Sequence, residues 1–372
     1  MIAALARRDG IDGRALRLFL ATRVALGLAA WAVVTLFDGH LNPRRGEWDS
    51  ARLHDLGRLV DVWARWDSDW FLRIAEHGYS WPSSTPAFFP LYPGVVAATG
   101  RVAGGHYVLA GVIVSLLAGS TAAVLLGRLT RDHLDETAGL RAVLYLSVVP
   151  TSLFLGAVYS EALFLALALA TFVLAERGRL GWAGVVAGLA MLTRAQGIAL
   201  LPALLLYAWP RGTRARAESV AVPLAIFASF PLLLWREIGH PFAFLDAQET
   251  VWRRQLSPIG PIGGLSQALR DADLVEVAFA VVMLTLAVVA WKRFGATYGV
   301  YALGALLLPM SFPSPHLGGL YSFPRLAIVA FPCFMALAAV TTSRRATVAT
   351  TAVLTAGLAV FVVRWALWQW VA

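Results

Sequence analysis

The chain has 372 residues, of which 59% are hydrophobic and 14% are charged. Soluble globular domains carry about 25% charged residues, so the composition excludes an ordinary soluble enzyme. The net charge of +9 does not indicate a nucleic-acid partner, because the basic residues fall in short links between long apolar runs. In such links they are typical of cytoplasmic loops that orient membrane helices. We therefore expect a polytopic helical protein whose partner is the lipid bilayer.

The amino-terminal part predicts one membrane helix followed by a long polar segment. The membrane helix is expected at 15–37, because the apolar run 18–37 is near full spanning length and is followed by no small-residue cleavage site of a signal peptide. The segment 38–105 then holds the densest mixture of aromatic, carboxylate and guanidinium groups in the chain. Spacings of three and four from Trp66 to His77 predict an amphipathic helix that ends at Gly78.

The rest of the chain alternates apolar runs with short polar links, and the total is about eleven membrane spans. A short run at 91–103 is expected to reach or re-enter the membrane. Two runs, 180–192 and 198–209, are short for full spans and predict a broken pair around a buried turn at 193–197. The other expected membrane helices are 107–129, 140–159, 162–175, 220–235, 274–291, 298–310, 325–340 and 346–368.

Alternating these spans from a cytoplasmic amino terminus places the arginine-bearing links on the cytoplasmic side, as the positive-inside rule requires. The same alternation places the segments of unusual composition on the outer side. We expect one transmembrane domain, 1–372, with its first extracytoplasmic loop at 38–105 and further loops at 236–273 and 311–325. Residues 159–161 and 193–197 are expected on that side as well.

Five short segments of the chain together resemble the signature of the PIG-V family. The family comprises mannosyltransferases related to the second mannosyltransferase of GPI-anchor assembly. The matching segments are RWDSDWFLRIAEHGY at 65–79, AFFPLYP at 87–93, YSEALF at 159–164, TRAQG at 193–197 and SFPR at 322–325, which precedes an apolar run that ends in Phe331 and Pro332. One departure is Asp69, where the family often has histidine, and this puts a proton-transfer role of that position in doubt.

The resemblance implies a bundle of the GT-C class, whose members take a sugar from a polyprenyl phosphate and act on the extracytoplasmic or lumenal side. It also implies a carboxylate in the first outer loop as general base, which here is Asp67. A chain of this size and arginine content is similar to a bacterial member in the plasma membrane. Since bacteria generally lack GPI anchors, the acceptor is expected to be a different lipid, glycan or protein, which the sequence does not identify.

Sugar transfer from a lipid phosphate also requires cations that stabilise the departing phosphate. Arg194 and Arg325 are lone arginines in apolar settings, and a guanidinium binds phosphate through paired hydrogen bonds. No cluster of histidines and carboxylates has convincing metal spacing, and the lone Cys333 excludes a cysteine cluster. We therefore expect neither a metal nor another cofactor.

The remaining polar groups of the outer segments are candidates for substrate binding. Each has a simpler structural explanation, such as an ion pair, a helix end or an aromatic belt at the membrane interface. These candidates are Asp69, Glu161, Arg65, His77, Gln248 and Trp252. Further candidates are Arg73, Arg253 and His316, with Trp66, Trp70, Phe88, Phe89 and Tyr92 as rings that stack on sugar or line an isoprenoid groove.

These expectations lead to one hypothesis and two alternatives. The hypothesis is an inverting, metal-independent transferase of mannose from polyprenyl-phosphate mannose. Intramembrane arginines and broken helices also suit a transporter or flippase of a lipid-linked sugar, although the sequence has no evident pair of matching repeats. A non-catalytic membrane assembly subunit leaves the polar constellation around Asp67 unexplained.

Overall fold

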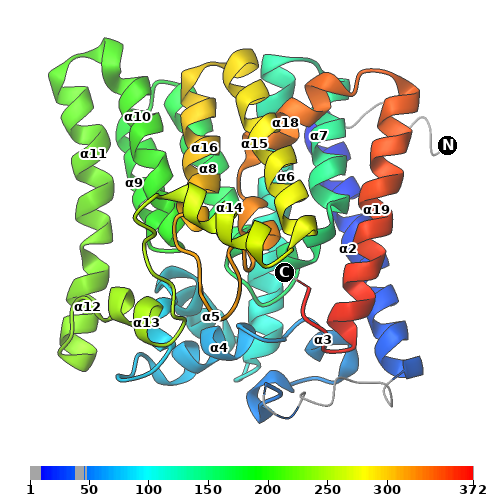
Figure 1. Cartoon of the computed structure of the whole chain (residues 1–372), viewed down its shortest axis with the longest axis vertical. Coiled ribbons are helices and arrows are strands. Elements are labelled where there is room, and N and C mark those ends of the chain that lie inside the picture. Colours follow the sequence, from blue (N-terminus) through cyan, green and yellow to red (C-terminus); the bar gives the residue numbers. More distant parts are fainter. Residues whose placement is uncertain (1–9, 38–45, 47, 372) are drawn as a thin grey trace. The chain divides into compact units, whose positions relative to one another are not determined.

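The computed structural model describes residues 10–37, 46 and 48–371, and the elements of these residues are helices joined by turns and loops (Figure 1). The described residues contain no β-strand, only an isolated bridge between Ser314 and Gly318. The chain divides into two compact units. Unit 1 comprises the described part of Met1–Leu72 with Val95–Leu169 and Phe334–Val371, and unit 2 comprises Arg73–Gly94 and Ala170–Cys333.

Among the described residues, five helices are long and apolar enough to cross a membrane. Three helical stretches of 10–17 residues are also apolar. The protein is therefore an integral membrane protein with an all-helical fold, while the expected number of about eleven spans stays a prediction. The long helices are Ile11–Phe37, Tyr107–His133, Thr213–Ile238, Leu274–Phe294 and Arg344–Ala366, and the shorter ones are Leu180–Met191, Ala296–Met310 and Phe331–Val340.

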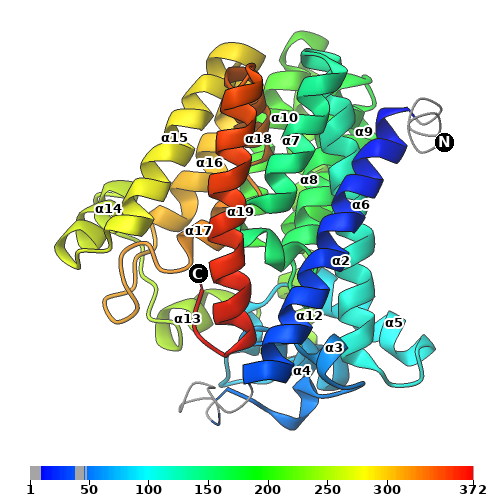
Figure 2. The same cartoon turned by 90° about the vertical axis from the view of Figure 1, so that its right-hand side faces the viewer.

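Unit 1 is built from four packed helices, seen side by side in Figure 2: α2 (Ile11–Phe37), α6 (Tyr107–His133), α7 (Glu136–Val148) and α19 (Arg344–Ala366). Small residues allow this close packing, as is usual between membrane helices. A Cβ atom at Gly119 would lie 2.6 Å from the ring of Phe19, and one at Gly139 would lie 2.7 Å from the carbonyl oxygen of Gly127. The short helix α3 (Arg58–Asp61) also contacts α2 and α6.

The expected single helix at 140–159 is wrong, because α7 ends at Val148 and a 3₁₀ helix, Pro150–Leu155, follows. Pro150 has no N–H to continue the helix and disfavours helical geometry in the residue before it. The freed carbonyl groups are satisfied by Arg23 of α2. This buried guanidinium donates to the carbonyl oxygen of Ser147 at 2.6 Å and also to that of Ser152.

Unit 2 confirms the expected broken pair, since α9 (Leu180–Met191) and α10 (Leu200–Ala208) are separated by the 193–197 turn. They pack with α11 (Thr213–Phe227), and α10 also packs on α16 (Ala296–Met310), which contacts α15 (Leu274–Phe294). Figure 1 shows α9, α10 and α11 in green. The expected helix 220–235 begins earlier and continues, after a break at Ala228, as α12 (Ser229–Ile238).

Several expected loops contain helices of their own. The polar stretch 236–273 folds into α13 (Ala243–Thr250) and α14 (Pro261–Arg270), and the expected helix 325–340 is interrupted between α17 (Phe323–Ala327) and α18 (Phe331–Val340).

The amphipathic helix is confirmed as α4 (Ser68–His77), with Gly78 in the left-handed region that ends it. The remaining helices are α5 (Leu91–Val102) and α8 (Glu161–Glu176).

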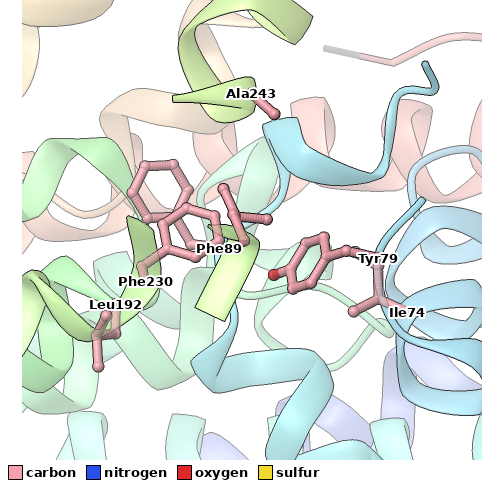
Figure 3. Close-up of a cluster of buried hydrophobic side chains, with 7 residues drawn as sticks. Ile74, Tyr79, Phe89, Leu192, Phe230 and Ala243 are labelled. Atoms are coloured by element: carbon pink, nitrogen blue, oxygen red, sulfur yellow. The ribbon is translucent and has the colours of Figure 1, made fainter. Parts of the chain in front are cut away.

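A buried cluster of unit 2 organises the aromatic motif at 87–93 (Figure 3). Tyr79, Phe89 and Phe230 form its centre, and the rings of Phe89 and Phe230 lie 5.2 Å apart. Burial, together with the nearby Glu237 carboxylate, raises the pKa of the Tyr79 hydroxyl well above its usual range. The hydroxyl therefore stays protonated and donates to the Phe88 carbonyl oxygen at 2.8 Å. The prediction that Phe88 and Phe89 touch substrate is not tested, but Phe89 has a clear packing role.

Candidate functional site

The hydroxyl of Tyr159 joins two of the motif segments within unit 1. It donates to the carbonyl oxygen of Arg65 at 3.1 Å and accepts the backbone N–H of Asp67 at 3.2 Å. A second link is the bond from the Val158 N–H to the Trp63 carbonyl oxygen at 3.0 Å. The segments 63–67 and 158–159 are distant in sequence, and these bonds bring them side by side.

The carboxylates of Asp67 and Glu161 both belong to this buried part of unit 1. Asp67 is 9% exposed and immediately precedes α4, whereas Glu161 is fully buried at 0% and begins α8. A negative side chain at a helix amino terminus is stabilised by the helix dipole. Carboxylates are seldom buried to this extent in proteins, so their placement here marks a candidate site.

Arg65 is held by the backbone around the same turn. Its side chain donates to the carbonyl oxygens of Asp61 at 2.6 Å and Ala64 at 2.9 Å, and its guanidinium lies 4.4 Å from the centre of the Trp368 ring. Its own backbone N–H donates to the Ser68 hydroxyl at 3.1 Å. The prediction that Arg65 binds substrate stays untested, while these contacts show that it shapes the turn.

Asp69 points to a different set of partners in unit 1. One carboxylate oxygen accepts a 2.9 Å hydrogen bond from the guanidinium of Arg52 and a further hydrogen bond from the Ser50 hydroxyl. The charge of Asp69 is therefore compensated by the segment that precedes the motif. The structure does not link Asp69 to the Tyr159 turn by these bonds, and its role in binding an acceptor remains a prediction.

In unit 2, the side chain of Gln196 joins two other motif segments. Its amide nitrogen donates to the carbonyl oxygen of Ala305 at 2.9 Å and to that of Leu326 at 3.0 Å. Gln196 lies in the 193–197 turn, and Leu326 directly follows Arg325. The turn that carries Arg194 and the helix that carries Arg325 are thereby tied to each other through a buried amide.

The two arginines expected to bind phosphate differ in burial. Arg325 is 9% exposed, while Arg194 is half-buried and donates from its Nε to the Gln196 side-chain oxygen at 3.3 Å. Gln196 thus orients Arg194 directly and the Arg325 segment through the backbone. Guanidinium groups fixed in this way suit the recognition of a phosphate, because less side-chain freedom is lost on binding.

Gln248 and Trp252 of the 236–273 segment lie against the aromatic motif. The Gln248 amide donates to the Ala87 carbonyl oxygen at 3.4 Å, and the Trp252 ring lies 6.0 Å from that of Phe88 in an edge contact. His316 of the third loop is 2.8 Å from the Arg253 guanidinium. The late loops are therefore joined to one another within unit 2, and their contact with substrate stays a prediction.

His77 is the predicted site residue with the fewest supporting contacts. Its side chain is 68% exposed and lies 3.5 Å from the Glu76 carboxylate. The structure gives it no bond to the other predicted site residues of unit 2. Its proposed role in orienting a hydroxyl group therefore gains nothing from the geometry.

The candidate metal ligands do not assemble in the part of the chain that the structure describes. No group of three or more His, Cys, Asp or Glu side chains there has an arrangement suited to a metal ion. The buried Cys333 donates from its Sγ to the Met283 carbonyl oxygen at 3.5 Å. Independence from metals remains a prediction.

Sequence reasoning missed three residues that shape these segments: Tyr159, Gln196 and Arg52. Tyr159 and Gln196 were present in the quoted motifs but carried no assigned role, because neither changes charge near neutral pH. Their signal was a hydrogen-bonding side chain in an otherwise apolar stretch, where an unpaired polar group is costly. Arg52 lay in a charged segment that offered no pattern.

The comparisons with known proteins confirm the resemblance that the motifs indicated. Residues 39–206 match the family model described as Mannosyltransferase (PIG-V). The chain is 38% identical over 159 residues to GPI alpha-1,6-mannosyltransferase 2 of Mus musculus, an alignment that covers 40% of this chain and 32% of that protein. For the protein of the same name in Rattus norvegicus the identity is 36% over 152 residues, covering 38% and 30%. The match therefore spans about a third of these curated relatives.

Among solved structures, the chain is similar in fold to ArnT from Cupriavidus metallidurans bound to undecaprenyl phosphate. The TM-score is 0.54 at 17% sequence identity, and the alignment covers 90% of this chain and 62% of that one. At this identity the likeness concerns the fold alone. Because the alignment covers 90% of the chain, it extends beyond residue 206, where the family-model match ends.

Proposed function

We propose that this chain, whose residues 39–206 match the PIG-V mannosyltransferase model, is a membrane glycosyltransferase. It moves a mannosyl residue from a polyprenyl-phosphate mannose to a lipid-linked or cell-envelope acceptor on the extracytoplasmic side. The activity follows the family match. The donor class is supported by the fold relative whose structure holds undecaprenyl phosphate.

One observation carries the proposal: the hydroxyl of Tyr159 holds the Asp67 turn against the segment that leads to Glu161. The motif at 65–79 contributes the buried Asp67, and the motif at 159–164 contributes the buried Glu161. The hydrogen bonds of Tyr159 join these two motifs. This arrangement supports an acid–base enzyme, because proton transfer requires a positioned carboxylate. A non-catalytic assembly subunit leaves it unexplained.

In the proposed reaction, Asp67 accepts the proton of an acceptor hydroxyl group. The hydroxyl oxygen attacks the anomeric carbon of the mannose, and the bond from that carbon to the phosphate oxygen breaks. The electron pair leaves with the polyprenyl phosphate, so one displacement inverts the configuration. Arg194 and Arg325 stabilise the charge that develops on the leaving phosphate, and Gln196 holds them in place.

Glu161 and Asp69 have supporting roles in this proposal. Glu161 is buried at the start of α8 and holds a hydroxyl of the sugar or acceptor. Asp69, paired with Arg52, contributes to the acceptor side. The reaction needs no metal, because a lipid monophosphate leaves with less charge than a nucleotide diphosphate and two guanidinium groups suffice.

The test is transfer by the purified full chain in proteoliposomes. The chain is supplied with radiolabelled polyprenyl-phosphate mannose and an acceptor-bearing membrane extract. The proposal expects label in a new product that appears only with the protein. Movement of the labelled lipid across the bilayer without a product would select the transporter instead. No product and no movement would contradict both activities.

A further inference from the structure

We propose that the carboxy-terminal segment 365–370 is a positioning element for Asp67. This segment ends α19 and lies about 300 residues from Asp67 in sequence, yet three of its tryptophans contact the turn that presents that carboxylate. The inference rests on the proposed function for its kinetic consequence. Its structural part stands on contacts within unit 1 alone.

The first contact is made by Trp365, which is almost fully buried. Its indole N–H donates to the Val62 carbonyl oxygen at 2.7 Å. Its ring also lies 5.8 Å from the ring of Tyr159, whose hydroxyl holds the backbone of Asp67. Trp365 therefore fixes both the start of the turn and the side chain that ties it down.

The second contact is made by Trp368, which stacks on Arg65. The guanidinium of Arg65 lies 4.4 Å from the Trp368 ring centre, within the range of a cation–π interaction. Trp368 itself has a φ of 59°, in the left-handed region that residues other than glycine rarely adopt. In this backbone conformation, the Trp368 ring lies over the Arg65 side chain.

The third contact is an aromatic cluster around Trp66, the residue next to Asp67. The Trp66 ring lies 5.7 Å from Trp368, 5.3 Å from Trp370 and 5.8 Å from Trp48. Trp66 also has a left-handed backbone, with a φ of 52°. Edge and tilted contacts of this kind stabilise one arrangement of rings. They favour the turn geometry that carries Asp67 into α4.

Together the three contacts hold residues 62–66, and the Tyr159 hydroxyl holds residues 65–67 through its two hydrogen bonds. These contacts fall on the residues that precede Asp67, so the segment acts on the backbone that carries its carboxylate. Misplacement of a catalytic group by about 1 Å can lower a rate by about 100-fold. Segment 365–370 is therefore expected to affect the chemical step rather than the binding of the donor.

The kinetic test compares Trp368→Ala with Trp368→Phe in the purified full chain, using radiolabelled polyprenyl-phosphate mannose and acceptor-bearing membrane extract. We expect Trp368→Ala to lower kcat by about 100-fold without a change in donor KM, and Trp368→Phe to restore most of kcat because the ring remains. Trp182→Ala, at an exposed position of α9, is the matched control and keeps the wild-type kcat. A wild-type kcat in Trp368→Ala, or a rise in KM alone, would overturn the proposal.

A second readout does not depend on activity. Hydrogen exchange of the purified chain is measured on peptides that cover 62–68, where Trp368→Ala is expected to speed exchange and Trp182→Ala is not. Trp370→Ala, at a half-buried position, serves if Trp368→Ala does not fold. Unchanged exchange at 62–68 would disprove the positioning role of segment 365–370 even if the chain transfers sugar. If the wild-type chain transfers no sugar, the proposed function fails, and the exchange measurement still decides whether segment 365–370 holds the turn.

Discussion

At the residue scale, the uncharged side chains of Tyr159 and Gln196 hold the motif segments together through hydrogen bonds. Tyr159 makes two hydrogen bonds to the Asp67 turn. Gln196 makes one to Leu326, next to Arg325, and one to Ala305 of α16. Removing one partner of a buried hydrogen bond leaves the other unsatisfied, at about 1–3 kcal/mol. Both residues are therefore tests of how the charged groups are held.

Tyr159→Phe keeps the buried ring and removes only the hydroxyl. We expect a lower thermal unfolding temperature, because the Arg65 carbonyl and the Asp67 N–H lose their partner, and a kcat about tenfold lower, as about 1.4 kcal/mol of lost positioning implies. The matched control is Tyr145→Phe, which removes a buried hydroxyl that bonds Thr341 at 2.7 Å elsewhere in unit 1. The control should lose stability but retain kcat. Equal kcat losses in both variants would refute a specific role of Tyr159.

Gln196→Leu replaces the amide by an apolar side chain of similar size. The carbonyl oxygens of Ala305 and Leu326 then lose their donor, and Arg194 loses its side-chain acceptor. We expect weaker binding of the donor lipid, seen as a donor KM raised about tenfold, which corresponds to about 1.4 kcal/mol. Gln255→Leu, at an exposed position, should leave the KM unchanged. A wild-type KM in Gln196→Leu would show that the amide does not organise the two arginines.

At the element scale, broken helices place the motif segments. The turn at 193–197 separates α9 from α10, and the 3₁₀ helix after Pro150 leads to the Tyr159 segment. Each break exposes backbone groups that need partners in a membrane. Arg23 supplies them at the α7 break by donating to the carbonyl oxygens of Ser147 and Ser152.

Gly197→Ala tests the break between α9 and α10. A Cβ atom at Gly197 would lie 2.6 Å from the Met191 Cα, so the backbone must shift. Overpacking of this kind costs about 1–3 kcal/mol, and we expect a lower unfolding temperature together with reduced transfer. Gly181→Ala, where nothing lies within 4 Å, should be neutral in both assays. Wild-type behaviour of Gly197→Ala would show that the turn tolerates a shift.

The sequence predicted elements well where hydrophobic length or periodicity is strong. Helix α6, helix α8, the broken pair and the amphipathic α4 follow the expected ranges closely. The break of α7 was missed although Pro150 is visible, because the apolar run continues past it. Helices α13 and α14 were missed because a polar stretch between spans shows neither a membrane-length run nor a strong cap. The candidate charges could be listed from the motifs, but the contacts of Tyr159, Gln196 and Trp368 depend on tertiary packing.

At the scale of the whole molecule, the protein has a membrane-embedded helical fold in which charged groups lie in buried parts of two units. The family match covers the segment with Asp67, Glu161 and Arg194, and the likeness to the ArnT fold covers most of the chain. Our proposal uses these groups without a metal. This makes chelation a direct test of the chemistry.

Transfer by the purified chain is expected to persist in EDTA at its rate without chelator. The reason is that Arg194 and Arg325 supply the positive charge that stabilises the leaving phosphate. The measurement is product formation with and without EDTA, followed by addition of Mg²⁺ or Mn²⁺. Loss of transfer in EDTA with recovery on adding either ion would contradict the metal-independent mechanism.

The most direct test of the central claim is the turnover number of Asp67→Asn in proteoliposomes, measured with radiolabelled polyprenyl-phosphate mannose. Asparagine has nearly the shape of aspartate but does not accept the proton, so kcat should fall at least about 100-fold while the variant unfolds at the wild-type temperature. Asp132→Asn, at an exposed position of α6, should match the wild-type chain. A folded Asp67→Asn protein that transfers mannose at the wild-type rate would contradict the account.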